Sequence, residues 1–315
     1  MTAPLIVLLG PTAVGKTELS LQLAEHLNGE IVSADSRLFY RGMDIGTAKP
    51  SPEERARVPH HLIDVADPDE TWSLALFQRA AHKAIADIHA RGRLPFLVGG
   101  TGQYLRAVYE AWELPEQRPH PRLRAVLETW GTQIGAPALH DRLAYLDPQA
   151  AARIEPNNLR RTVRALEVIF LTGRRFTDQR RRGDAPYLTL LIGLTRPREE
   201  LYARVDARIQ AMLAAGLVDE VRALLAHGYS PDLPAMSAIG YRQIAAALQG
   251  EYCLEEAITL IRRLTRQFVR RQANWFKTDD PQIHWFPMGE STLTQVEAEI
   301  RTFCAAAVWQ GVPER

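Results

Sequence analysis

Short apolar runs alternate with amphipathic stretches over the first third of the chain. The runs 5–9, 30–34, 61–65 and 94–98 have the length and apolar character of buried strands. Leucines at 19, 23 and 27 recur at a helical spacing, and residues 72–90 and 103–111 continue helical patterns. Strands that alternate with helices predict a parallel sheet with helices on both faces. Ligands of such sheets bind at the carboxyl ends of the strands.

The pattern changes near residue 115, where three prolines fall within 115–121. From there to about residue 186 the chain is helical and basic, and an apolar run at 187–194 predicts a return to the sheet. Residues 196–305 are mostly helical in pattern. We therefore expect a helical insertion domain at 115–186 and a core built from 1–114 and 187–315 with a helical C-terminal part.

A glycine-rich segment joins the first predicted strand to the first predicted helix. Gly10–Thr17 (GPTAVGKT) matches the phosphate-binding loop G-x-x-x-x-G-K-[ST] in its proper strand–loop–helix context. The glycines let backbone N–H groups surround phosphate oxygens, while the helix N-terminus and Lys16 supply positive charge. The Thr17 hydroxyl can ligate Mg²⁺. The sequence thus predicts an α/β fold with a P-loop NTPase-like parallel sheet flanked by helices.

Polar residues follow two further predicted strands. Asp35 and Ser36 end the second strand, and Gly99-Gly100-Thr101 ends the strand at 94–98. A carboxylate beside the phosphate loop can accept a proton or hold a metal through water, although Asp also favours a helix N-cap. Two successive glycines indicate that a ligand or another backbone approaches closely.

Composition narrows the class of protein. The net charge is +1, and Cys253 and Cys304 are the two cysteines in 315 residues, which fits a reducing cytoplasm and argues against a zinc site. No apolar run approaches the ~18 residues of a membrane span. The first strand begins too early for a signal peptide. We expect a cytoplasmic protein with no membrane association.

Basic residues gather in two segments of this nearly neutral chain. Residues 153–182 hold nine arginines and three acidic residues, and residues 262–277 hold six basic residues and no acidic ones. Arg262, Arg266 and Arg270 form a helical row, which is usually a solvated face but here lacks interleaved acids. These segments favour contact with a polyanion. Arg204 and Arg208 share a helical face, and either could bind phosphate or form a surface ion pair.

The motifs together resemble one family. Residues 10–17 are followed by DSRLFYRGMDIGTAKP at 35–50, PHHLID at 59–64, VGGTGQY at 98–104, IGYRQ at 239–243 and TRQ…RRQANWF at 265–276. In this order and spacing they are similar to the bacterial tRNA dimethylallyltransferases, also called isopentenyl-tRNA transferases. The block at 35–50 is the most specific part of the resemblance.

The resemblance implies transfer of a dimethylallyl group from its diphosphate to the N6 amine of adenine 37 in tRNA. It implies catalytic roles for Asp35 as general base, Thr101 near the reacting amine, and Arg208 as a diphosphate ligand. It implies Mg²⁺ as cofactor with Thr17 helping to place it, and the anticodon stem-loop of tRNA as partner of a protein that we expect to be a monomer. The diphosphate would bind at Gly10, Pro11, Thr12, Ala13, Val14, Gly15, Lys16 and Thr17. The implied tRNA contacts are Asp35, Ser36, Arg37, Leu38, Thr101, Leu159, Arg160, Arg161, Thr162, Val163, Gly240, Tyr241, Arg242, Arg270, Arg271, Gln272, Asn274, Trp275 and Lys277.

Two other functions remain open from the residues alone. A small-molecule or nucleotide kinase would use the same phosphate loop and would form ADP. An RNA-binding P-loop switch would change its RNA affinity with nucleotide and alter no base. The basic segments argue against the kinase, and Asp35 beside the phosphate loop argues against the switch.

Overall fold

A six-stranded parallel sheet forms the centre of the protein. The computed structural model describes residues 3–114, 120–179, 183–307, 309 and 311. The strand order is β3-β2-β4-β1-β5-β6, and each neighbouring pair is parallel. The strands are β1 (Pro4–Leu9), β2 (Gly29–Ser33), β3 (His60–His61), β4 (Leu94–Gly99), β5 (Leu188–Thr195) and β6 (Ile283–Pro287). The predicted α/β class with a parallel sheet is confirmed.

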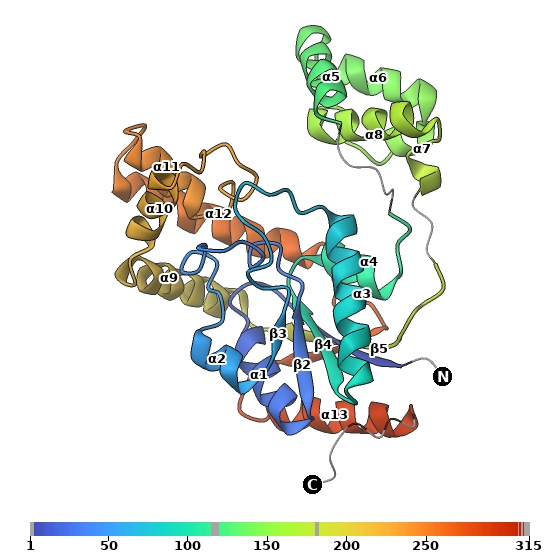
Figure 1. Ribbon diagram of the computed structural model, residues 1–315, viewed down its shortest axis with the longest axis vertical. Coiled ribbons are helices and arrows are strands. Elements are labelled where there is room, and N and C mark those ends of the chain that lie inside the picture. Colours follow the sequence, from blue (N-terminus) through green and yellow to red (C-terminus); the bar gives the residue numbers. More distant parts are fainter. Residues whose placement is uncertain (1–2, 115–119, 180–182, 308, 310, 312–315) are drawn as a thin grey trace. The chain divides into compact units, whose positions relative to one another are not determined.

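The central strand β1 explains why its sequence is continuously apolar. Residues 5–9 are fully buried, because β4 and β5 pair with the two edges of β1 and helices pack against the sheet. Helix α1 (Lys16–His26) contacts β1, β2 and β4 and packs with α13 (Thr292–Ala306), whereas α3 (Leu74–Ala90) packs with α4 (Gly102–Tyr109). Figure 1 shows these helices around the sheet.

The first compact region of the chain also contains several further helices. They are α2 (Pro52–Arg57), α9 (Arg198–Ala214), α10 (Leu217–Ala226), α11 (Tyr241–Leu248) and α12 (Leu254–Ala273). The Ser73 side chain caps α3 by accepting from Leu76 N at 3.2 Å. No helix in the described ranges has the length and apolarity needed to cross a bilayer.

The chain divides into two compact units. One comprises Met1–Tyr109 and Ala185–Arg315, and the other comprises Glu110–Asp184. The second unit contains α5 (Pro121–Ile134), α6 (Ala136–Leu146), α7 (Pro148–Ala151), α8 (Leu159–Thr172) and a 3-10 turn (Thr177–Gln179). It has its own apolar core around Leu127, Leu139, Leu143 and Leu166. Prolines 115 and 119 of the expected hinge lie outside the described residues.

Two details differ from the sequence prediction. The third predicted strand, 61–65, is reduced to His60–His61, because Leu62 and Asp64 adopt positive φ angles of 63° and 55° that an extended strand does not allow. The segment 196–305, expected to be mostly helical, also supplies β6, which pairs with β5 from Leu191 to Thr195. This edge strand is five residues long and is only partly buried, so its signal in the sequence is weak.

Candidate active site

The phosphate loop lies between β1 and α1 and is stabilised from within by its own lysine. Gly10 and Gly15 adopt φ angles of 153° and 114°, and a Cβ on Gly10 would lie 2.9 Å from Leu194 O. Lys16 Nζ donates to Gly10 O at 3.0 Å and to Pro11 O at 2.9 Å. These contacts curl the loop around the ammonium group.

Two arginines bind two further carbonyl oxygens of the loop. Arg196 Nε donates to Val14 O at 2.9 Å, and Arg204 Nε donates to Ala13 O at 2.7 Å. Within the described part of the chain, the N–H groups of Ala13, Gly15, Lys16 and Thr17 donate no hydrogen bond. The carbonyl oxygens of Gly10, Pro11, Ala13 and Val14 are therefore bonded within the protein, while these N–H donors are available for an anion.

The charge of Lys16 is incompletely compensated. Burial lowers the pKa of its amine to about 8, although the Asp35 carboxylate opposes this shift and the Arg208 guanidinium adds to it. An anion bound beside the amine would favour the charged form and raise the pKa again. The electrostatics of the loop thus suit a phosphorylated ligand.

Arg208, on α9, is a second cation near the loop. Burial lowers the pKa of its guanidinium, Asp35 opposes this, and Arg204 adds to it. No hydrogen bond or ion pair of Arg208 occurs among the described residues. Arg208 also lines a cavity of about 440 Å³ formed by residues 44–52 and the C-terminal half of α9. Of the two arginines that the sequence singled out, Arg204 supports the loop and Arg208 is left for a ligand.

Asp35 follows β2 and keeps one carboxylate oxygen free. Its Oδ1 accepts from Arg37 N at 3.0 Å, which closes a tight turn rather than capping an α-helix. Oδ2 has no hydrogen-bond partner in the residues that the structure covers. The Asp35 charge acts on both Lys16 and Arg208, so the three groups share one region. A free carboxylate oxygen at this position can accept a proton.

Thr101 lies where β4 meets α4, and the glycines before it are closely packed. A Cβ on Gly99 would lie 3.0 Å from Ala34 O, so here a neighbouring backbone is the close partner, as one of the two expectations held. At Gly100 the close partner is a side chain: a Cβ would lie 2.3 Å from Gln272 Nε2. Gln272 fills the space in which a ligand was also considered.

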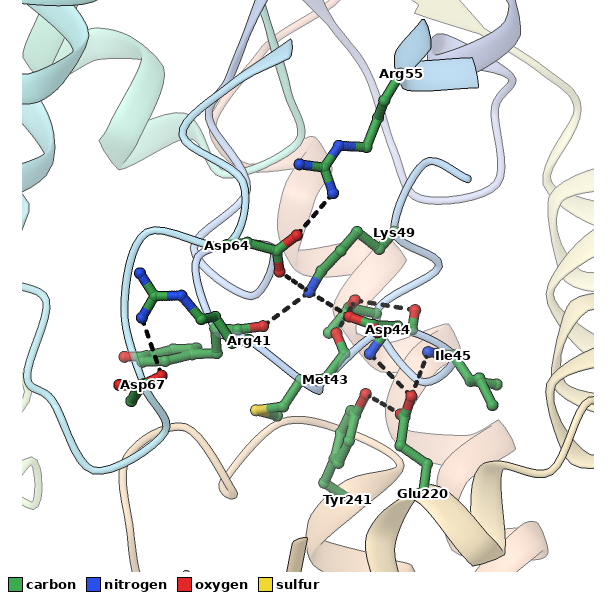
Figure 2. Close-up of polar contacts among 12 residues, drawn as sticks. Arg41, Met43, Asp44, Ile45, Lys49, Arg55, Asp64, Asp67, Glu220 and Tyr241 are labelled. Atoms are coloured by element: carbon green, nitrogen blue, oxygen red, sulfur yellow. Dashed lines mark hydrogen bonds and ion pairs between the residues drawn. The ribbon is translucent and has the colours of Figure 1, made fainter. Parts of the chain in front are cut away.

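The segment 40–50, which carries the most specific part of the resemblance, is held by a polar network (Figure 2). Glu220 of α10 accepts from Asp44 N at 2.9 Å, Ile45 N at 2.8 Å and Gly46 N at 3.3 Å. Tyr241 OH donates to the same carboxylate at 2.5 Å.

Lys49 completes this network from inside. Its side chain is 4% exposed and donates to Asp64 Oδ1 at 2.6 Å, to Asp44 and to Tyr40 O at 2.8 Å. Asp64 also pairs with Arg55 at 2.7 Å. Both carboxylates form structural ion pairs, and Asp64 thereby holds the segment 40–50 in place.

The expected tRNA contacts divide into exposed and buried side chains. Arg160, Arg161, Arg242, Arg270, Arg271, Asn274, Trp275 and Lys277 are exposed. Thr162, Val163, Gly240, Tyr241 and Gln272 are buried. A helix turns by about 100° per residue, so five successive residues cannot all face outward. In α8, Thr162 and Val163 face the core of the second unit.

Arg37 is also engaged within the protein. Its guanidinium donates to Pro234 O at 2.9 Å, to Ala235 O at 3.3 Å and to Ser237 Oγ at 3.3 Å. These bonds tie the segment after Asp35 to the segment before α11. Ser36 and Leu38 are partly exposed beside it.

Sequence reasoning missed three residues that shape the site: Arg196, Glu220 and Lys49. Arg196 comes directly after β5, so the rule that sites gather at the carboxyl ends of parallel strands could have found it. Glu220 acts on residues about 175 positions earlier, and nothing local in the sequence marks that contact.

A phosphate loop, Arg208 and Asp35, the last two with unpaired polar atoms among the described residues, lie at one edge of a parallel sheet and define a P-loop α/β enzyme whose site suits a phosphorylated ligand. The family follows from comparison with known proteins. The model of the IPP transferase family matches residues 38–279, and the chain belongs to this family.

Full-length relatives agree with that assignment. A tRNA dimethylallyltransferase of Roseiflexus sp. (strain RS-1) is 57% identical over 297 residues, which are 94% of this chain and 97% of the relative. The protein of the same name from Halalkalibacterium halodurans is 46% identical over 97% of this chain and 98% of the relative.

Solved structures are similar over the same length. The tRNA isopentenylpyrophosphate transferase of Bacillus halodurans is 44% identical with a TM-score of 0.71, and the match covers 98% of this chain and 97% of that one. A eukaryotic dimethylallyltransferase acting on tRNA has a TM-score of 0.80 at 27% identity, over 97% of this chain and 79% of that one.

Proposed function

We infer that this enzyme transfers a dimethylallyl group from dimethylallyl diphosphate to the N6 amine of adenine 37 in tRNA. The observation that carries the inference is that Lys16, Arg208 and Asp35 share one region. The two positively charged side chains can bind an anion there, and the Asp35 carboxylate beside them can accept a proton. The family membership and the names of the relatives favour this transfer over the kinase alternative.

The diphosphate half of the reaction belongs to the phosphate loop. The free N–H groups of Ala13, Gly15, Lys16 and Thr17, together with the side chains of Lys16 and Arg208, would bind the diphosphate and stabilise its growing negative charge as the C1–O bond breaks. Such stabilisation is needed because the adenine amine, whose lone pair is delocalised into the ring, is a weak nucleophile. The loop therefore activates the leaving group and need not hydrolyse a nucleotide.

The acceptor half belongs to Asp35 and Thr101. As the N6–C1 bond forms, N6 becomes positively charged and Asp35 Oδ2 takes its proton, while the diphosphate leaves with the bonding electrons. Thr101, at the end of the neighbouring strand β4, is proposed to lie beside the amine. Adenine 37 must leave its stack to reach these residues.

Mg²⁺ is the cofactor that the donor set fits. Thr17 is exposed at the start of α1, and the described residues hold no cluster of three or more His, Cys, Asp or Glu side chains. A metal here would be bound mainly by diphosphate oxygens with the Thr17 hydroxyl, which is the way Mg²⁺ is usually held beside phosphates. When bound, Mg²⁺ would neutralise charge on the leaving diphosphate.

The tRNA partner is proposed to contact exposed basic side chains. Arg160 and Arg161 are exposed on α8, whereas Arg164 pairs with the buried Glu167 and is less free to bind phosphate. Arg270 and Arg271 are exposed near the end of α12. We further propose that the enzyme binds the anticodon stem-loop of the tRNA, that it is a monomer, and that it is cytoplasmic.

Mass spectrometry tests the function directly. The protein is incubated with Mg²⁺, dimethylallyl diphosphate and an unmodified anticodon stem-loop, and a matched stem-loop with guanine at position 37 serves as control. A mass gain of one dimethylallyl group on the adenine substrate alone would establish donor, acceptor and reaction. No gain on either RNA, together with ADP release from ATP, would favour a kinase.

A further inference from the structure

Gln272 connects the two halves of the proposed site. Its Oε1 accepts from Thr12 N, in the phosphate loop, at 2.8 Å. Its Nε2 donates to Gly100 O, directly before Thr101, at 3.1 Å. One amide group thus bonds to residues about 260 and 172 positions earlier in the chain.

The surroundings are shaped to receive this side chain. Gln272 is 6% exposed although it is polar and lies between Arg271 and Ala273 near the end of the basic helix α12. A Cβ on Gly100 would lie 2.3 Å from Gln272 Nε2, and a Cβ on Gly102 would lie 2.5 Å from the Trp275 side chain. The end of α12 is therefore packed against the turn that carries Thr101.

The bridge needs the chemistry of an amide. Thr12 N–H requires an acceptor and Gly100 O requires a donor, and an uncharged amide supplies both at once. A carboxylate would supply the acceptor but would place negative charge against Gly100 O. An alanine would leave the part-buried Thr12 N–H and the buried Gly100 O without these partners.

We propose that Gln272 is a positioning residue that holds the phosphate loop in register with the Gly100–Thr101 turn. On the proposed function, this register sets the separation between the leaving diphosphate and the acceptor amine. Gln272 itself touches neither substrate. Misplacement of reacting groups by about 1 Å can cost about 10²-fold in rate.

The decisive variant is Gln272→Glu, because its protonation state switches the bridge. A neutral carboxyl group is similar in shape to the amide, and its O–H can donate to Gly100 O while its C=O accepts from Thr12 N. Burial raises the pKa of a carboxyl group, which brings this protonation into a usable pH range. The prenyl transfer rate is measured in single turnovers between pH 5.5 and 8 and divided by the wild-type rate at each pH.

We expect the relative rate of Gln272→Glu to be about 10²-fold low at pH 8 and to recover as the pH falls. Gln272→Ala should be low at every pH, with tRNA binding within about twofold of wild type. Gln295→Glu, on the exposed face of α13, is the matched control and should follow wild type throughout.

Two results would overturn the proposal. A Gln272→Ala enzyme with wild-type rate would show that the bridge is dispensable. A low relative rate of Gln272→Glu that does not change with pH would show that the residue supports the fold alone. If the wild-type enzyme forms no product, the proposed function fails instead, so the two failures are distinguishable.

Discussion

Glu220 offers a quantitative test of how the segment 44–46 is held. Glu220→Ala removes an acceptor from Asp44 N, Ile45 N and Tyr241 OH, at 2.9, 2.8 and 2.5 Å, and from Gly46 N at a weaker 3.3 Å. At about 1 kcal/mol for each of the three shorter bonds, the free energy of unfolding should fall by about 3 kcal/mol. For a protein of this size that lowers Tm by about 6–12 °C.

Glu220→Gln should cost less. Its single carbonyl oxygen can still accept from Asp44 N and Ile45 N, and the Tyr241 hydroxyl can rotate to accept from the new amide. We expect a loss of about 1 kcal/mol. Differential scanning calorimetry measures both changes, with Glu290→Ala as a control at an exposed carboxylate. A shift below about 2 °C for Glu220→Ala, or equal shifts for the two variants, would refute the assigned bonds.

Three further outcomes follow from the site. Asp35→Asn should lower the transfer rate by about 10²–10⁴-fold while tRNA binding is retained, and an unchanged single-turnover rate would remove Asp35 as the base. Because the pKa of Lys16 is about 8 without ligand and rises when an anion binds, affinity for diphosphate should be full below pH 8 and fall above it. Calorimetric titrations at pH 7–9.5 measure this, and a constant affinity would contradict it. Arg270→Ala with Arg271→Ala should weaken tRNA binding and flatten its salt dependence; an unaltered slope of log K against log salt would exclude phosphate contacts there.

The sequence predicted the elements whose signals are local. The phosphate loop is one continuous motif between a buried strand and a helix, and Asp35 comes directly after a strand, so the position of each at the sheet edge followed from topology. The strand β6 was missed because an edge strand is only half-buried and its alternation is weak.

Long-range contacts account for the rest. Gln272 lies in a basic helical segment, but its partners Thr12 and Gly100 lie 260 and 172 positions earlier in the chain. Similarly, the resemblance gives Tyr241 as a tRNA contact, and its burial against Glu220 could not be predicted from the sequence. A helical pattern in one sequence predicts which residues share a face of the helix. The partner of each side chain on that face depends on the tertiary fold.

The position of the second unit within the chain has a consequence for synthesis on the ribosome. Strand β1 can pair with β4 early, but its other edge pairs with β5, at Leu188–Thr195, which is made only after the whole unit Glu110–Asp184. At about 5–20 residues per second, that apolar edge stays unpaired for several seconds. The helical unit, with its own core, can fold during this interval. Chaperones should therefore bind β1 in nascent chains stalled before residue 188, and should not bind it in longer chains in which β5 has paired with β1.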